Sequence, residues 1–78
     1  MRRIVSDPEV LGGKPVVENT RISVEQILGL LSHGMSHADI VEAYPELSIE
    51  DINEVLKYAV NALHNEVVIE VKSKKEVE

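Results

Sequence analysis

Three serines in the middle of the chain each open a stretch of apolar residues at helical spacing. Ser23, Ser36 and Ser48 are each followed three residues later by a Gln or an Asp. In that arrangement the serine hydroxyl accepts a hydrogen bond from the backbone at a helix start, and the later side chain returns one. Gly34 is expected to end the first helix and Pro45 the second. The pattern predicts three helices.

The third predicted helix carries the longest apolar face in the chain. Its apolar residues at the spacing of one helical face are Ile52, Val55, Leu56, Ala59, Val60 and Leu63. Only Pro45, Glu46 and Leu47 separate this helix from the second. A turn that short makes two helices cross steeply, as in a helix-turn-helix unit. The first helix then covers the angle between them and completes a three-helix core.

The residues before the helices favour β structure. Arg3–Val5 is a candidate for a short strand. Pro15–Val17 and Thr20–Ile22 flank Glu18 and Asn19, which predicts a small β-hairpin. Asn tolerates the left-handed conformation that such a turn can require.

The last residues change character again. Val67–Lys72 is β-branched and partly alternating, so it is predicted to be a strand. A lone strand must pair with the N-terminal hairpin, with a second subunit or with another protein. The predicted fold is mainly α, a three-helix helix-turn-helix-like core with a short N-terminal β-hairpin and a C-terminal strand or tail. One domain is expected over residues 1–66, with a β-rich tail over residues 67–78.

The predicted core has few large side chains. The chain of 78 residues has no Phe and no Trp, and its rings are those of Tyr44 and Tyr58. A domain this small is only marginally stable alone, so we expect a second copy to cover apolar surface in a homodimer. Cys is absent, which excludes a disulfide scaffold and a thiolate metal site. With no signal peptide or membrane-spanning stretch in the sequence, a cytoplasmic location is expected.

The net charge of −6 is unevenly distributed. Residues 1–21 hold four basic residues against three acidic ones, and residues 67–78 are neutral. Residues 22–66 hold eight acidic residues against Lys57 alone. The predicted helices therefore repel phosphate.

Several polar groups invite a catalytic or metal site, but a structural role explains each more simply. His33 and His37 are four apart, yet Gly34 and a helix start lie between them, so they belong to different helices. The acidic run at Glu50, Asp51 and Glu54 lies where carboxylates suit the positive end of a helix. No nucleophile, base and orienting group are grouped in the sequence. We predict no catalytic residue, no cofactor and no metal.

The start of the third helix would enter the major groove in a helix-turn-helix reader. Asn53 suits adenine there, but the acidic residues around Lys57 oppose phosphate. DNA contact is therefore expected mainly through the N-terminal arms of a dimer. The candidate DNA-binding residues are Arg2, Arg3, Lys14, Arg21, Asn53 and Lys57. For Arg21, pairing with a helix carboxylate is the favoured alternative, because the helices carry excess negative charge.

A protein partner fits the other features. The acidic surface suits a basic partner, and the tail offers an unpaired β-rich segment for strand addition. The candidate partner-binding residues are Val67, Val68, Ile69 and Val71.

The order of several short motifs resembles a known prokaryotic family, domain of unknown function 433. The motifs are Gly12-Gly13-Lys14-Pro15-Val16-Val17, Thr20-Arg21-Ile22-Ser23-Val24, Gly34-Met35-Ser36, Tyr44-Pro45-Glu46-Leu47-Ser48, Asp51-Ile52 and Tyr58-Ala59. The resemblance covers about residues 3–60 and departs at Asn19, where the family usually has Gly. It implies a helix-turn-helix-like fold without enzymatic activity. Some relatives look like the antitoxin half of a toxin–antitoxin pair, whose partner is a small nuclease-like toxin.

We therefore expect a non-enzymatic, antitoxin-like protein that binds a protein partner and, through the arm, its own promoter DNA. A helix-turn-helix transcriptional regulator without a toxin partner is one alternative. A purely structural dimerising module is another.

Overall fold

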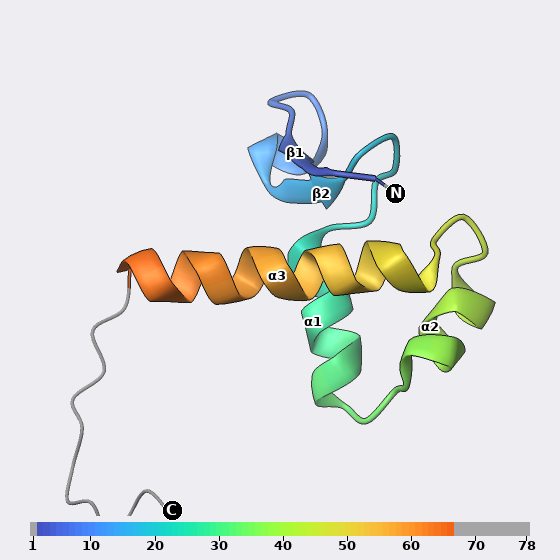
Figure 1. Ribbon diagram of the computed structural model, residues 1–78. Coiled ribbons are helices and arrows are strands. Elements are labelled where there is room, and N and C mark those ends of the chain that lie inside the picture. The colour runs from blue at the N-terminus through green and yellow to red at the C-terminus, as the bar shows by residue number, and fades with distance from the viewer. Residues whose placement is uncertain (1, 67–78) are drawn as a thin grey trace, which may run out of the picture.

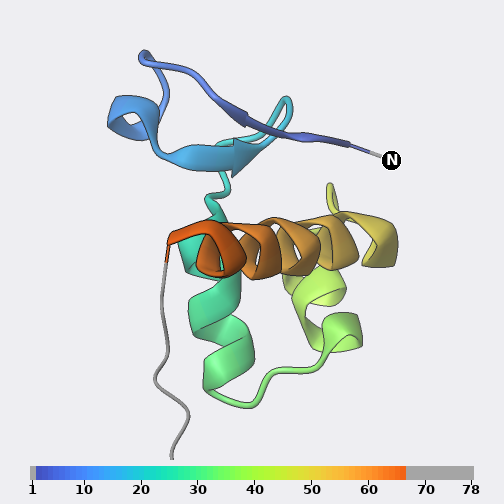
Figure 2. The same ribbon diagram turned by 60° about the vertical axis from the view of Figure 1, so that its left-hand side comes forward.

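The computed structural model describes residues 2–66 and has a small β-hairpin and three helices. Strand β1 (Ile4–Ser6), a 3₁₀ helix (Leu11–Gly13) and strand β2 (Pro15–Val17) precede helices α1 (Val24–Ser32), α2 (His37–Ala43) and α3 (Ile49–Glu66). Helix α3 runs between the hairpin on one side and α1 with α2 on the other (Figures 1 and 2). The predicted fold class, mainly α with a short N-terminal hairpin, is confirmed. The predicted strand Val67–Lys72 lies outside the described residues.

All three helices begin where their serines predict. Ser36 and Asp39 form the complete reciprocal capping pair at the start of α2, with distances of 3.0 and 3.2 Å. Ser48 and Asp51 do the same for α3, at 3.1 and 2.9 Å. These bonds satisfy backbone N–H groups that a helix start otherwise leaves without partners.

The predicted capping pair at the start of α1 forms only by half. The Ser23 hydroxyl accepts from the Gln26 backbone N–H at 2.9 Å, as expected. The Gln26 side chain does not return a bond to Ser23; its amide donates to the Tyr44 hydroxyl at 2.8 Å. Gln26 thereby ties the first turn of α1 to the end of α2, so a tertiary contact replaces the local one.

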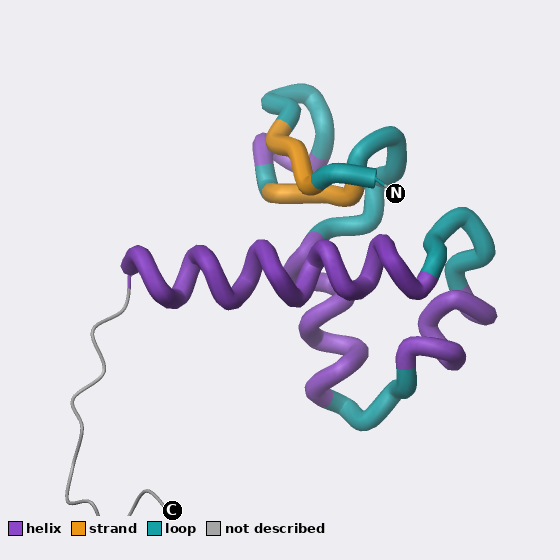
Figure 3. The backbone as a smooth tube through the Cα atoms, viewed as in Figure 1, coloured by secondary structure: helices purple, strands orange, loops and turns teal. Residues whose placement is uncertain are grey.

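The helix ends also follow the sequence. Helix α1 closes through Gly34, whose φ of +95° is the left-handed conformation that glycine adopts without steric cost. The backbone N–H of Gly34 donates to Leu31 and that of Met35 to Leu30, at 3.0 and 3.2 Å. These are the two bonds of a Schellman motif. Helix α2 ends at Ala43, two residues before Pro45. In Figure 3 the loop that follows leads directly into α3.

The predicted β-hairpin pairs differently from the expectation. Strand β2 pairs antiparallel with β1, from Ile4 opposite Val17 to Ser6 opposite Pro15. The segment Thr20–Ile22 forms no strand. On that side the Val17 backbone N–H donates to the Ile22 carbonyl at 3.0 Å, and an isolated bridge joins Val16 to Ser23. The reason that Thr20–Ile22 does not form a strand lies in hydrogen bonds within the turn itself.

The Thr20 hydroxyl explains why its segment stays curled. It donates to the Val17 carbonyl at 2.8 Å and accepts from the Ile22 backbone N–H at 3.0 Å. Both bonds close a tight turn, which keeps residues 20–22 from extending beside β2. Asn19 sits in this turn with φ of +64°, so the expected left-handed turn residue is confirmed.

The core is made of aliphatic side chains from β2, from the three helices and from the loops before α1 and α3. Its buried residues are Val16, Val17, Ile22, Val24, Ile27, Ile40, Leu47, Ile52 and Val55. Tyr44 is half-buried at the edge of this cluster, and Tyr58 is exposed. The prediction of a core without large ring anchors is thus confirmed for the described residues.

The apolar face of α3 is only partly used by this core. Ile52 and Val55 are completely buried, whereas Val60 and Leu63 are 63% and 57% exposed. The reason is length: α3 has 18 residues, while α1 and α2, which cover it, have 9 and 7. The second half of α3 therefore extends past α1 (Figure 1). Within residues 2–66 no helix is long and apolar enough to cross a membrane.

Candidate binding surfaces

The N-terminal strand places Arg2 against the start of α3. The Arg2 backbone N–H donates to Asp51 Oδ1 at 3.1 Å, and its guanidinium lies 3.8 Å from Asp51 Oδ2. The same guanidinium donates to the carbonyl oxygen of Glu46. Arg2, a candidate DNA-binding residue, is therefore also a clamp that holds the N-terminus on the turn between α2 and α3.

Asp51 lies at the buried centre of these contacts between Arg2, Glu46 and Asp51, which we call the Asp51 clamp. Its side chain is only 5% exposed. Burial alone would raise its pKa, because a charged carboxylate is poorly solvated there. Hydrogen bonds from Ser48 and from the Arg2 backbone, together with the Arg2 charge, outweigh burial and lower the pKa of Asp51 below its ordinary value. Asp51 is thus held ionised as a structural group of the fold.

Two further basic residues of the N-terminal half, Arg3 and Lys14, form exposed ion pairs. Arg3 Nη2 lies 3.5 Å from Glu18 Oε2, and Lys14 Nζ lies 3.3 Å from Glu25 Oε1. Exposed pairs of this kind contribute about 0–1 kcal/mol each. Arg3 and Lys14 therefore lie at the surface, and breaking their ion pairs costs little free energy.

Arg21 differs from these residues. Its side chain is exposed, and no carboxylate of residues 2–64 lies within 4.0 Å of it. The expected pairing of Arg21 with a helix carboxylate is therefore not seen in the described part of the chain. Arg21 borders a pocket between the hairpin and the turn before α3, together with Glu18 and Glu46.

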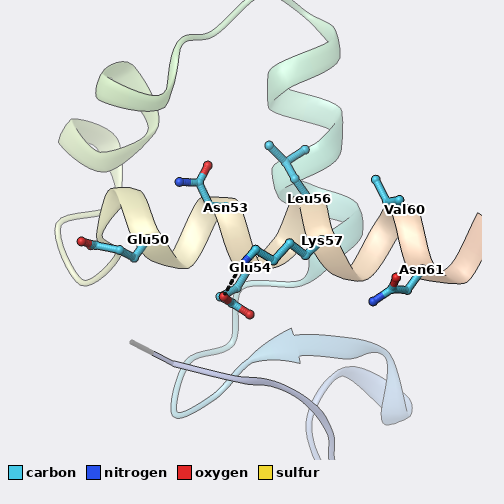
Figure 4. Close-up of a pocket in the computed structure, with 7 residues that line it drawn as sticks. All are labelled: Glu50, Asn53, Glu54, Leu56, Lys57, Val60 and Asn61. Carbon is cyan, nitrogen blue, oxygen red and sulfur yellow. Dashed lines mark hydrogen bonds and ion pairs between the residues drawn. The ribbon is translucent and has the colours of Figure 1, made fainter.

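The outer face of α3 presents the last two DNA candidates. Asn53 is exposed, and Lys57 Nζ lies 3.3 Å from Glu54 Oε2. An open pocket along the helix is lined by Glu50, Asn53, Glu54, Leu56, Lys57, Val60 and Asn61 (Figure 4). In the figure Leu56 and Val60 point to the same side of α3. Lys57 thus forms a weak, exposed ion pair within its own helix, and Leu56 and Val60 lie on one side of the pocket.

His33 and His37, which were considered as metal ligands, lie at the ends of two different helices. His33 caps α1, with its Nδ1 2.8 Å from the Gly29 carbonyl, and His37 is the first residue of α2. The two residues lie on different helices, as predicted. Within residues 2–66 no three His, Asp or Glu side chains come together in an arrangement suited to a metal ion.

The exposed apolar residues of α3 are the feature that sequence reasoning did not isolate. Periodicity assigned Val60 and Leu63 to the same face as Ile52, but it does not tell which part of a face is covered. A usable signal was present, because the segment from Ser48 onward is predicted to be far longer than the two helices that precede it.

Comparison with known proteins places these features in a family. Residues 4–59 match the family described as Protein of unknown function (DUF433). The chain belongs to this family. Uncharacterized protein y4eO of Sinorhizobium fredii (strain NBRC 101917 / NGR234) is 38% identical over 56 residues, which is 72% of this chain. The chain spans about a quarter of that relative's length, 25%. No solved structure matches the chain.

The family match covers the hairpin, α1, α2 and the first half of α3. The matched part of this DUF433 chain thus contains the core and Asp51, whereas Arg2 lies just before it. The match ends at residue 59, just before Val60.

Proposed function

We propose that this DUF433 protein is a non-enzymatic, antitoxin-like binding protein that holds a protein partner. The observation that supports a binding role is the uncovered apolar half of α3, where Val60 and Leu63 are more than half exposed and accessible to another chain, including a second copy. Large apolar side chains exposed side by side on one helix are typical of protein-binding surfaces. Binding, not catalysis, is the activity that such a surface supports.

The carboxylates favour the same conclusion. Asp51 is buried within hydrogen bonds that cap α3, and Glu54 is paired with Lys57. Neither carboxylate has a base or nucleophile arranged beside it in the described residues. The positions of these two carboxylates are explained by the fold alone, without a role in acid–base chemistry.

The segment proposed to hold the toxin-like partner is the tail, with Val67, Val68, Ile69 and Val71 as its contact residues. These residues lie outside the described part of the chain. In the sequence they directly follow Glu66, the last residue of α3. Strand addition by the tail would use main-chain hydrogen bonds for affinity and alternate side chains for specificity.

Co-expression with the protein encoded by the adjacent gene tests this proposal. A small nuclease-like neighbour is expected to co-purify with the full chain, and its toxicity is expected to be relieved. Deleting residues 67–78 should abolish co-purification while far-UV circular dichroism and the unfolding temperature stay unchanged. Deleting only residues 73–78 removes charged groups but keeps the β-branched segment, so this control should still bind.

Two outcomes would contradict the proposal. Full binding by a chain that ends at residue 66 would exclude the tail as the contact segment. A neighbouring gene that encodes no such partner would favour the regulator or the purely structural module.

DNA contact through the N-terminal arm is a second candidate function, and exposed Arg21 is the observation that favours it. With no ion pair to a described carboxylate, this guanidinium is available to a phosphate. Arg3 and Lys14 are released from exposed pairs at little cost.

The double substitution Arg3→Ala with Arg21→Ala is expected to weaken binding to promoter DNA about tenfold or more and to flatten its salt dependence. Arg2 is unsuited to this test, because its loss would also disturb the Asp51 clamp. Fluorescence anisotropy over a series of salt concentrations measures the effect. As a control, Lys57→Ala removes one positive charge from α3 and should change the affinity little. Equal losses from both variants would contradict an arm-centred contact.

A further inference from the structure

Four exposed or half-buried residues form one apolar stripe along α3, called the α3 seam here. The α3 seam consists of Ile49, Leu56, Val60 and Leu63, of which Ile49 is 43% exposed and Leu56 half-buried. Ile49, Leu56 and Leu63 are spaced seven residues apart, two helical turns each, so they share one face of the helix. Val60 lies between the last two, on the side toward which Leu56 points (Figure 4).

The α3 seam lies beside the core and not within it. Ile52 and Val55, the α3 residues that pack into the core, are completely buried. A heptad stripe next to a core-facing stripe gives a helix two contact faces, one for its own domain and one for another helix. The second face has no partner within residues 2–66.

The charges along α3 make this second face complementary to itself. Its first turns carry the exposed Glu50 and the half-buried Glu54, whereas Lys57 and His64 follow Leu56. Asp51 is buried against Arg2 and does not take part, and Glu66 is the last residue of the helix. Two α3 helices side by side in parallel would set acid against acid. In the antiparallel orientation the acidic half of one helix lies beside the half of the other helix that contains Lys57 and His64. The two helix dipoles then point in opposite directions, which is the favourable arrangement for neighbouring helices.

We propose that two copies of this chain associate through antiparallel α3 helices along the α3 seam. The two-fold axis passes near Leu56, and Ile49 of each copy packs against Leu63 of the other. This closed, isologous interface uses one surface patch twice. The inference rests on the proposed function in that the protein acts by binding, but it requires no particular toxin. The second copy of the chain binds along the α3 seam, and the tail is free to bind the proposed protein partner.

The arrangement has a geometric consequence for the proposed function. The two α3 C-termini lie at opposite ends of the helix pair, each beside the acidic start of the other copy's α3. A partner bound beyond residue 66 would therefore be held once at each end. The expected stoichiometry of the complex is two partner molecules on one dimer.

Sedimentation equilibrium of the isolated full chain tests the interface. Val60→Glu and Leu63→Glu are each expected to raise the dimer dissociation constant about 100-fold, since every dimer carries the change twice at roughly tenfold each. Asn61→Glu adds the same charge to the same helix away from the α3 seam and should leave the dimer unchanged. Circular dichroism checks that all three variants keep their helices, as expected for exposed positions.

Cross-linking tests the orientation, and the absence of native Cys makes each introduced thiol unique. An antiparallel pair brings Asn53 of one copy near Val60 of the other. Oxidising a mixture of Asn53→Cys and Val60→Cys chains should therefore give mainly the mixed disulfide. A parallel pair would give disulfides between identical chains and would overturn the proposal.

Two sedimentation results would also overturn the inference. One is a wild-type chain that remains monomeric up to about 100 µM, and the other is a dimer that Leu63→Glu does not weaken. Both measurements use the isolated chain, so their failure leaves partner binding by the tail intact. Failure of the co-expression test would, conversely, leave the dimer unaffected.

Discussion

Replacing Asp51 with alanine is expected to lower the free energy of unfolding by about 2–3 kcal/mol. The carboxylate accepts hydrogen bonds from the backbone N–H groups of Ser48 and Arg2, at 2.9 and 3.1 Å, from a nearly buried position. Its removal leaves these two N–H groups without their partner and removes the charge that faces the Arg2 guanidinium, while the Ser48 hydroxyl still caps the backbone of residue 51. The N-terminal strand is released at the same time.

Chemical denaturation and thermal unfolding measure this loss. In a domain of this size each kcal/mol corresponds to about 4–8 °C, so the unfolding temperature should fall by roughly 10–20 °C. Glu50→Ala is the matched control, since it removes the neighbouring, exposed acid of the same first turn. It should cost less than about 1 kcal/mol. Equal losses for both variants would contradict the clamp.

The same carboxylate fixes the sign of the acid response. The pKa of Asp51 in the folded protein lies below its ordinary value of 3.8, so the ionised form stabilises the fold. This contribution is fully present above that ordinary value and is lost as the pH falls through the lower, folded-state pKa. Asp51→Asn should therefore be less stable near neutral pH and show a shallower loss of stability in acid. Parallel acid titrations of both proteins would contradict this assignment.

Truncating Ile52 is expected to have an effect of similar size for a different reason. Ile52 is completely buried in the core, so Ile52→Ala should lower the free energy of unfolding by about 2–5 kcal/mol. Leu63→Ala removes the same number of carbon atoms from the same helix, but Leu63 is 57% exposed. In dilute protein, where self-association is absent, it should cost less than about 1 kcal/mol.

Urea denaturation of both variants at low protein concentration measures the contrast. A large loss from both would mean that Leu63 is buried within the monomer, contrary to the division of the α3 face described above. If Leu63→Ala becomes more costly as the protein concentration rises, that increase reports its burial between copies.

Much of the local structure was predictable because it depends on nearby residues. Each serine cap, the end of α1 at Gly34 and the end of α2 before Pro45 involve groups only a few residues apart. The left-handed turn residue Asn19 belongs to the same class. Such features are set by local hydrogen bonds and by sterically allowed backbone angles, which short stretches of sequence specify.

The errors occur where a side chain has both a local and a distant partner available. Gln26 was expected to bond to Ser23 but reaches Tyr44, which is 18 residues away. Strand β2 was expected to pair with Thr20–Ile22. It pairs over its whole length with β1 and meets the other segment only through the bond from Val17 to Ile22 and the bridge between Val16 and Ser23, because the Thr20 hydroxyl bonds within its turn. In both cases the long-range contact forms in place of the local one because of how the elements pack in three dimensions, and the spacing of residues along the chain does not reveal that packing.

The candidate site shows the same division. The sequence established that α3 is acidic at its start and apolar along one face, and it identified the basic residues of the arm. Only the three-dimensional arrangement put Arg2 on Asp51 and left Arg21 without a described ion-pair partner.

The sequence by itself determined the three helices, their boundaries and the aliphatic character of the core, since these follow from local capping and periodicity. The tertiary structure alone decided which apolar residues are covered. Helices α1 and α2 are too short to cover all of α3, and coverage depends on how elements pack, not on which residues repeat. That physical difference separates Ile52, which holds the domain together, from Leu63, which remains exposed beyond it.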